Sequence, residues 1–320
     1  MWRGAALALG LAAAMPARTG DLRSHPAPAR GYEETVKRAR NLIAADDSVV
    51  SEGGSSILRV HGHRTPRVVI LLHGFTNSPR EFAGLADSLF AAGDNVLVPR
   101  LPRHAIRGKN VAELSNLTAS ELCRTADAAV DIAAGLGDSI VTMGLSVGGT
   151  LALWAAEYRI EVRRAVVIAP PFEVGTVPSI LEKPLINLGA HVPNVSRRSA
   201  SDSARPDRLP GFTTHARSQV LRLSMAVRRE AEQRAPMRAE ALFLVNAHDR
   251  TVKTAPVLDI ARELNRHGSP ALVYELPDSL GLPHNFIDPA EPSPASSAAT
   301  PVLMALAHGE APPRWLGRRR

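Results

Sequence analysis

The sequence predicts an α/β fold in which a mostly parallel sheet carries helices on both faces. Short apolar runs alternate along the chain with longer helical patterns, which is the order of βαβ units. Residues 68–72 (VVILL) have no polar alternation and include β-branched side chains, as expected for a strand buried on both faces. The alternation stops between Pro170 and Pro236 and then resumes, which indicates a cap inserted into one α/β domain.

The elements can be placed from composition and spacing. Phe82, Leu85 and Leu89 recur at helical intervals within residues 79–92. Strands are expected at residues 56–61, 68–72, 95–99, 139–143, 164–169, 241–245 and 271–276. Helices are expected at residues 32–44, 79–92, 120–136, 147–158, 255–267 and 301–308, and in the cap at 178–190 and 216–234.

The chain divides into five segments on these patterns. We expect a signal-like segment at 1–17, a linker and helix at 18–45, a core at 46–170 plus 236–310, a helical cap at 171–235 and a basic tail at 311–320. Arg3 precedes an apolar run that ends near Ala14, which predicts export to a periplasm or medium. The alternative is an Ala-rich start on a cytoplasmic protein. No cysteine follows the run, which argues against a lipoprotein anchor.

The charge and the cysteine content limit the kinds of partner and cofactor that can be expected. The formal net charge is +7, and the segment from Arg197 to Arg238 contains ten arginines but only four acidic residues. No nucleic-acid motif accompanies them, so we expect a solvated face with no nucleic-acid partner and at most weak contact with an anionic membrane. The single cysteine, Cys123, falls in a helical pattern and is expected to be a buried apolar residue. No Cys/His cluster indicates a metal, and no cofactor is expected.

The motif that carries chemistry is Gly144-Leu145-Ser146-Val147-Gly148. Chance would give about 0.1 such matches in a chain of this length. Its context is more specific, because Ser146 stands between an apolar strand and a helix, where a sharp turn presents the hydroxyl above the sheet edge. A glycine-rich turn without chemistry is the alternative, but the dinucleotide and P-loop fingerprints are absent. Ser146 is therefore predicted to be a nucleophile.

A serine nucleophile needs a base, and on such a turn the acid and then the histidine follow the serine in the chain. Among eleven histidines, His284 lies in a Gly/Pro loop after the last sheet strand, whereas His267 and His308 fit helix surfaces. Asp249 follows the strand after the cap and is predicted to orient the imidazole. Asp278 and Asp288 are the rivals for that position.

The negative charge of a tetrahedral intermediate is usually received by two backbone N–H groups. Val147, next after the nucleophile, is predicted to supply one, and Phe75, in the loop after residues 68–72, the other. Gly74 is expected to allow the turn there. His-Gly occurs four times in the chain, and this occurrence alone follows a buried apolar strand, so His73 is interpreted as structural.

These pieces together resemble the α/β-hydrolase superfamily, with the strongest likeness to bacterial carboxylesterases and monoacylglycerol-lipase-like enzymes. The matching segments are residues 71–77 (LLHGFTN), 144–149 (GLSVGG), His248-Asp249 and 282–284 (LPH). The resemblance implies an eight-stranded sheet, a Ser146–Asp249–His284 triad and oxyanion donors at Phe75 and Val147. Relatives often carry Gly-His-Gly where this chain has Arg103-His104-Ala105, so one rim of the pocket departs from the pattern.

The expected function is hydrolysis of carboxylic esters, of short- to medium-chain acyl esters or monoacylglycerol-like lipids. Leu181, Leu185, Ile186 and Leu188 are spaced to line an acyl pocket or to pack the cap onto the core. A serine aminopeptidase, with Glu173 or Glu182 holding an amine, and an acyltransferase remain alternatives on the same machinery. A non-catalytic binding protein is the third class. The sequence does not indicate an oligomeric state.

Overall fold

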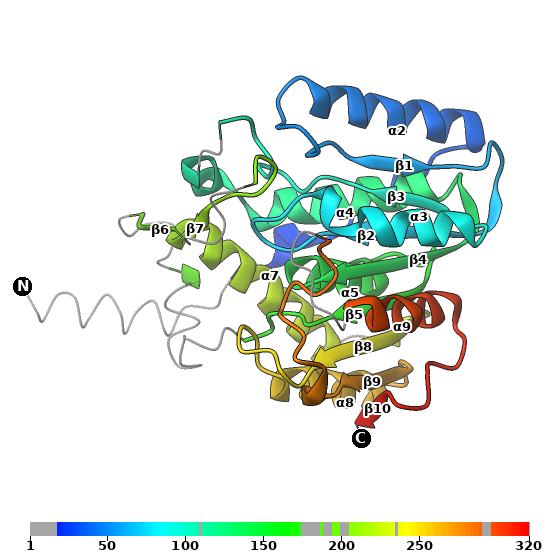
Figure 1. Ribbon diagram of the computed structural model, residues 1–320, viewed down its shortest axis with the longest axis vertical. Helices are drawn as coiled ribbons and strands as arrows, with labels where there is room; N and C mark the ends of the chain where they lie inside the picture. Colours follow the sequence, from blue (N-terminus) through cyan, green and yellow to red (C-terminus); the bar gives the residue numbers. More distant parts are fainter. Residues whose placement is uncertain are drawn as a thin grey trace, which may run out of the picture.

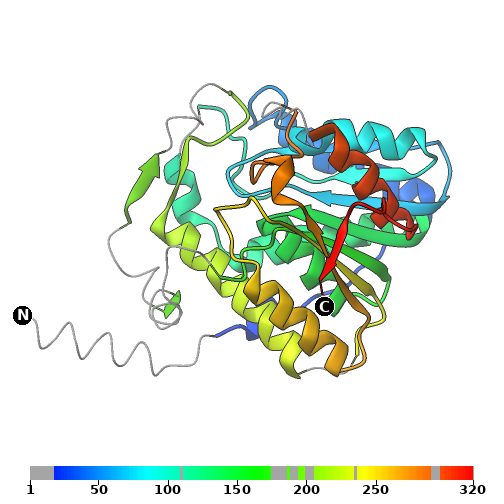
Figure 2. The same ribbon diagram turned by 60° about the horizontal axis from the view of Figure 1, so that its bottom comes forward.

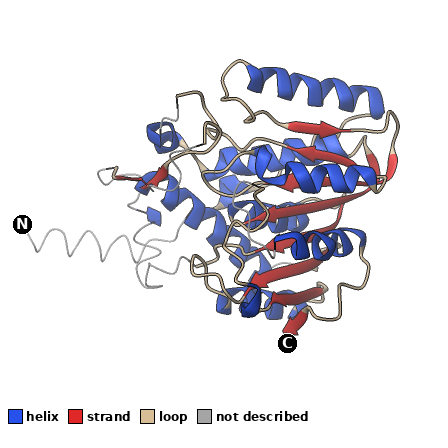
Figure 3. Cartoon of the chain, viewed as in Figure 1, coloured by secondary structure: helices blue, strands red, loops and turns tan. Residues whose placement is uncertain are grey.

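The computed structural model describes residues 18–108, 111–173, 186–187, 194–198, 205–233, 236–289 and 296–319. A central sheet of eight strands lies between two layers of helices, and Figure 3 shows the strands running through the middle. The strand order is β1-β3-β2-β4-β5-β8-β9-β10, with antiparallel pairing at the two edges and parallel pairing between. The strands are β1 (Ile57–Arg59), β2 (Thr65–Leu72), β3 (Asn95–Val98), β4 (Gly137–Leu145), β5 (Val162–Ile168), β8 (Glu240–Asn246), β9 (Ala271–Leu276) and β10 (Gly317–Arg319). The predicted eight-stranded, mostly parallel α/β fold is confirmed.

Successive residues of β2 explain the two helical layers. Val68 and Ile70 pack into one core cluster, while Val69 and Leu71 pack into another on the opposite face. Because side chains alternate across a strand, a strand covered on both faces must be apolar throughout. The first face is covered by α4 (Ala119–Ala133), α5 (Val147–Tyr158), α7 (Thr214–Gln233) and α8 (Ala255–Arg266), and the second by α3 (Ala83–Ala91) and α9 (Ser296–His308) (Figure 1).

The helix α2 (Tyr32–Asp47) and the segment before it are bound to this frame. Residues 18–45 were expected to hold a linker, yet Leu22 is fully buried and its carbonyl accepts a hydrogen bond from Trp154 Nε1 at 2.8 Å. Asp127 accepts from Ser24 Oγ at 2.5 Å and from the His25 N–H at 2.6 Å. The stretch from residue 18 to α2 is therefore anchored to the core at Leu22 and Asp127, although most of its residues are exposed.

Between β5 and β8 lies the inserted segment. Its described parts include the short antiparallel pair β6 (Ser196–Arg198) and β7 (Gly211–Thr213), then α7, which lies beside α8 (Figure 2). The helix predicted at 216–234 is confirmed as α7, whereas the helix predicted at 178–190 falls largely outside the described residues. Ile186 is buried against Leu221 and Met225 of α7, so it packs two parts of the inserted segment against each other. Leu181, Leu185 and Leu188, predicted with it, lie outside the described residues, as do Glu182 and the signal-like residues 1–17.

The C-terminus departs from the expectation of a plain basic tail. Residues Gly317–Arg319 form β10, which pairs antiparallel with β9, and Arg319 Nη2 lies 2.6 Å from Glu275 Oε1. Part of the basic tail therefore forms the edge strand of the sheet. Among the described helices, none is long and apolar enough to cross a membrane.

Candidate active site

Ser146 lies at the junction of β4 and α5 with a backbone conformation of φ 57° and ψ −122°. A non-glycine residue held in such a sparsely populated region costs about 1–3 kcal/mol, and such strain clusters at active sites. The turn is fixed from both sides, since the Ser146 N–H donates to the Ile168 carbonyl at 2.8 Å and its own carbonyl accepts from the Thr150 N–H at 3.1 Å. The side chain is thus held above the carboxyl end of β4.

The glycines of the motif allow α5 to approach the sheet. A Cβ placed on Gly148 would lie 1.8 Å from the Leu72 carbonyl oxygen, and one on Gly144 would lie 2.2 Å from the Gly148 backbone. Real Cβ atoms do not approach backbone so closely, and backbone cannot turn away as a side chain can. The small residues at these positions are therefore required by the packing of the turn itself.

His284 and Asp249 are brought together across 35 residues of chain. His284 Nδ1 lies 2.6 Å from Asp249 Oδ2, while Asp249 Oδ1 accepts hydrogen bonds from the Thr251 N–H at 2.7 Å and the Val252 N–H at 3.4 Å. Burial raises the pKa of Asp249, but the hydrogen bond and charge of His284 and these two N–H groups outweigh it and lower the pKa overall. The carboxylate is therefore ionised at neutral pH and able to stabilise an imidazolium.

The parallel sheet explains why these segments meet. Ser146 directly follows β4, Asp249 follows β8 and His284 follows β9. The strands β4, β5, β8 and β9 are parallel neighbours, so their carboxyl ends lie along the same edge. All three predicted side chains are carried by loops at that edge.

The rival residues have other partners. Asp278 lies 3.0 Å from His248 Nδ1 at an exposed position, and Asp288 is bound to Arg205 at 2.5 Å. His308 Nε2 lies 2.7 Å from Asp94 Oδ2, and His267 caps the C-terminal end of α8. Of the three aspartates considered as the acid, Asp249 is the one bonded to His284.

His73 is built into the loop as a structural residue, as predicted. Its Nε2 accepts from the Leu101 N–H at 2.9 Å, so the ring proton is on Nδ1, which donates to the Gly74 carbonyl at 2.9 Å. Burial and the nearby ring of His104 lower the pKa of His73 well below its ordinary value. Cys123, predicted to be a buried apolar residue, is buried with a pKa raised chiefly by burial.

The loop that carries Phe75 turns differently from the expectation. Gly74 does not adopt a positive φ, and a Cβ there would make ordinary contacts at 3.5 Å with Glu81. The left-handed residue is Thr76, at φ 70°. The Phe75 ring packs against His104, with ring centroids 5.6 Å apart, and against Phe212 of β7 at 6.3 Å. Val147, the other predicted donor, opens α5, where a first-turn N–H has no acceptor within the helix.

The Arg103-His104-Ala105 segment keeps the backbone that glycines would favour. Arg103 has φ 64° and Ala105 has φ 54°, both in the left-handed region where side chains other than glycine are strained by about 1 kcal/mol or more. Arg103 is held by a 2.9 Å ion pair with Glu121. His104 is fully buried, and burial lowers its pKa to about 4, so it is neutral. The rim thus has two left-handed positions, and neither of them is a glycine.

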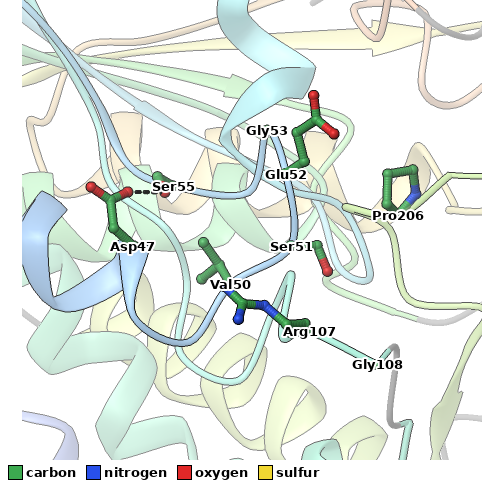
Figure 4. Close-up of a pocket in the computed structure, with 9 residues that line it drawn as sticks. All are labelled: Asp47, Val50, Ser51, Glu52, Gly53, Ser55, Arg107, Gly108 and Pro206. Carbon is green, nitrogen blue, oxygen red and sulfur yellow. Dashed lines mark hydrogen bonds between the residues drawn. The ribbon is translucent and has the colours of Figure 1, made fainter.

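A groove of about 810 Å³ borders the cap segment at Pro206 (Figure 4). Asp47 and Ser55 face each other in it through a 2.6 Å hydrogen bond. Ser146, Asp249 and His284 are not among its lining residues.

Within the part of the chain that the structure describes, no group of three His, Cys, Asp or Glu side chains is arranged to hold a metal ion.

Comparisons with known proteins agree with this architecture. Residues 69–316 match the model of the alpha/beta hydrolase family. A thermostable monoacylglycerol lipase from Bacillus sp. (strain H-257) is 27% identical over 142 residues, which are 44% of this chain and 54% of that protein, so the chain spans about half the length of the curated relative it matches. A structure from a study of LipS and LipT, two metagenome-derived lipolytic enzymes, covers 82% of this chain and all of its own, at 20% identity and a TM-score of 0.63. The Paleococcus ferrophilus monoacylglycerol lipase covers 79% of this chain and 98% of its own, at 17% identity and a TM-score of 0.61.

Proposed function

Since the chain belongs to the alpha/beta hydrolase family, we propose that it is a serine hydrolase that cleaves carboxylic esters through an acyl-enzyme on Ser146. The observation that carries this proposal is the 2.6 Å contact between His284 Nδ1 and Asp249 Oδ2 on the same sheet edge as the strained Ser146 turn. Asp249 fixes the Nδ1–H tautomer of His284 and leaves Nε2 as the acceptor for the proton of Ser146.

In the proposed reaction, Ser146 Oγ attacks the acyl carbon while His284 Nε2 takes its proton. The oxyanion of the tetrahedral intermediate is received by the N–H groups of Phe75 and Val147. The intermediate collapses as His284 returns the proton to the leaving alcohol. Water then attacks the acyl-enzyme with His284 as base, which releases the acid and restores Ser146.

We propose short- to medium-chain acyl esters or monoacylglycerol-like lipids as the substrate class. The name of the Bacillus relative, a monoacylglycerol lipase, supports this class. An aminopeptidase finds less support, because Glu173 already lies 3.4 Å from Lys253 Nζ and so has a cationic partner. We further propose export, on the apolar N-terminal sequence alone.

The test is hydrolysis of p-nitrophenyl esters of graded chain length beside amino-acid p-nitroanilides, with wild type and Ser146→Ala. We expect the esters to be hydrolysed by wild type, and Ser146→Ala to lose both this activity and labelling by a fluorophosphonate probe. Turnover of the anilides alone would overturn the ester assignment. Equal labelling of the two proteins would overturn Ser146 as the nucleophile.

A further inference from the structure

A buried acidic network lies behind the loop that carries Phe75. Glu81, Asp207 and Asp288 are each at most 1% exposed, although they come from the turn before α3, from the cap and from the loop after His284. Burial raises the pKa of Glu81 to about 8, the Gly74 N–H opposes this, and the charge of Asp288 adds to it. Burying three carboxyl groups together costs free energy of folding unless each accepts hydrogen bonds or pairs with a cation. The donors that each carboxyl group contacts therefore show which segments the network holds in place.

Glu81 holds both sides of Phe75. Its Oε2 accepts from the Gly74 N–H at 2.6 Å, and its Oε1 accepts from Asn77 Nδ2. The Asn77 N–H in turn donates to the Gly74 carbonyl at 3.2 Å, which closes the turn around Phe75. One carboxyl group therefore fixes the residues just before and two after the predicted oxyanion donor.

Arg205 joins this loop to the loop of His284. Its guanidinium binds Asp207 through Nε at 3.2 Å and Nη2 at 2.6 Å, and binds Asp288 through Nη1 at 2.5 Å. Asp207 also accepts from Ser78 Oγ at 2.6 Å. Although burial raises the pKa of Asp207, the hydrogen bonds from Arg205 and Ser78 lower it overall, so the ion pair is charged at neutral pH.

The same cap segment is bonded to the backbone of the Phe75 loop, where the Leu209 N–H donates to the Thr76 carbonyl at 2.9 Å. On the other side, Asp288 lies four residues after His284, in a turn closed by its N–H to the Asn285 carbonyl at 2.9 Å. A single guanidinium from the cap thus spans the segment of the predicted oxyanion donor and that of the predicted base.

We propose that Glu81 and Arg205 are positioning residues, which set the direction of the Phe75 N–H and its register with His284 through Gly74, Asn77 and Asp288. This inference rests on the proposed function. An oxyanion donor acts on charge that exists in the transition state and not in the bound substrate. Loss of its orientation should therefore lower kcat and leave KM nearly unchanged.

The first test is Glu81→Ala against Glu81→Gln, with kcat, KM and melting temperature measured on one p-nitrophenyl ester. Glu81→Ala is expected to lower kcat about 10- to 100-fold, less than complete loss of an oxyanion donor, with KM nearly unchanged. Glu81→Gln is expected to restore most of that loss. Its amide oxygen can accept from the Gly74 N–H. Once the Asn77 amide turns over, its amide nitrogen can donate to Asn77 Oδ1, a buried atom for which the described residues provide no partner.

The second test is Arg205→Met against Arg164→Met. Arg164 is a matched control, because it forms a 3.0 Å ion pair with Glu240 and its side chain is 22% exposed, against 18% for Arg205. Both variants should lose stability, but Arg205→Met alone should lose kcat, by about tenfold. If either drastic variant does not fold, Asn77→Ala and Arg205→Lys each remove part of the network and should lower kcat in the same direction.

The outcomes separate the two proposals. If Ser146→Ala abolishes ester hydrolysis while Glu81→Ala and Arg205→Met lower the melting temperature at unchanged kcat, the network is structural and the positioning proposal is wrong. If Ser146→Ala still hydrolyses the ester, the proposed function is wrong, and the positioning proposal, which depends on it, is wrong as well. A selective loss of kcat, recovered in Glu81→Gln, supports both.

Discussion

At the scale of single residues, the sequence narrowed the acid to three aspartates, and the structure separates them by their partners. Asp249 contacts His284, Asp278 contacts His248 and Asp288 contacts Arg205. Position after a strand end was enough to favour Asp249, because that position is set by the order of strands. The partner of Asp288 could not be predicted, since Arg205 is 83 residues away in the chain and in the least regular part of it.

Asp249→Asn should abolish most activity with little effect on the fold. The asparagine can keep its oxygen toward the Thr251 N–H, but its amide then donates to His284 Nδ1 and forces the ring proton onto Nε2, where it blocks proton transfer from Ser146. We expect kcat to fall by up to about 10⁴-fold, as in other triads, with a nearly unchanged melting temperature. Steady-state kinetics on a p-nitrophenyl ester provides the measurement.

Asp278→Asn is the control for this substitution, since Asp278 is exposed and bound to a different histidine. It should keep the wild-type kcat. Equal losses in the two variants would mean that the acid assignment is wrong.

Glu81→Gln should change how stability depends on pH. The pKa of Glu81 is about 8 in the folded protein against an ordinary 4.5, so across this window the folded state holds a proton that the unfolded state has lost. The free energy of unfolding should therefore fall by about 1.4 kcal/mol per pH unit as pH rises through the window, a loss that Glu81→Gln cannot show. Gly74, Asn77, Asp288 and Arg208 face the group and are the same in both proteins.

Urea unfolding of the two proteins at several values between about pH 5 and pH 8 isolates this effect, because all other titrating groups cancel in the difference. The advantage of Glu81→Gln should grow with pH. A constant difference would show that Glu81 is ionised in the folded state across the whole range.

At the scale of elements, the strands and helices of the core could be predicted because burial imposes a clear pattern on them. The strand β9 has the predicted bounds, and α5 begins and ends as expected. The strand β10 could not be predicted, since Gly317–Arg319 is short, basic and exposed and is held by pairing with β9 rather than by its own pattern. The pair β6 and β7 is equally short and was missed for the same reason.

The positions of strained backbone also could not be predicted from the sequence. Thr76, Arg103 and Ala105 adopt left-handed conformations that their residue types do not favour. Surrounding contacts impose these conformations, such as the Leu209 N–H to the Thr76 carbonyl. A local pattern carries no record of contacts made by a segment more than 100 residues away.

Gly148→Ala should disrupt the junction of β4 and α5. Its Cβ would meet the Leu72 carbonyl oxygen at 1.8 Å, so the helix and strand would have to separate. We expect a loss of at least about 3 kcal/mol in the free energy of unfolding, measured in urea. Gly84→Ala is the matched control in α3, because nothing lies within 4 Å of its Cβ, and better helix propensity should stabilise it by up to about 1 kcal/mol. A wild-type-like Gly148→Ala would contradict the close packing.

At the scale of the whole molecule, Arg159 connects the N-terminal segment to the core. Its side chain is fully buried and lies 2.7 Å from Asp127 and 2.6 Å from Asp131. These two carboxylates also accept from Ser24, His25 and Ala27 of the segment before α2. The sequence suggested a linker before α2 because segments rich in Pro and Arg are usually exposed. The anchoring contacts could not be predicted, because the burial of Arg159 leaves no recognisable pattern in the sequence.

Arg159→Met should therefore cost far more than loss of an exposed ion pair. It leaves two buried carboxylates without their cation, for which a loss of about 3–5 kcal/mol is typical. Arg262→Met, which breaks the exposed Arg262–Asp259 pair, should stay within about 0.5 kcal/mol of wild type. Urea unfolding monitored by tryptophan fluorescence compares them directly, and similar midpoints would contradict the burial of the network.

The order of strands along the chain also has a consequence in time. The turn of Ser146 is complete once β4, β5 and α5 have been synthesised, but Asp249 and His284 follow β8 and β9, the last two parallel strands. A growing or truncated polypeptide that stops before residue 284 has the proposed nucleophile without its proposed base. On the proposed mechanism, hydrolysis can begin only after residue 284 has been made, so the onset of turnover during synthesis would report when β8, β9 and the loop of His284 have joined the sheet.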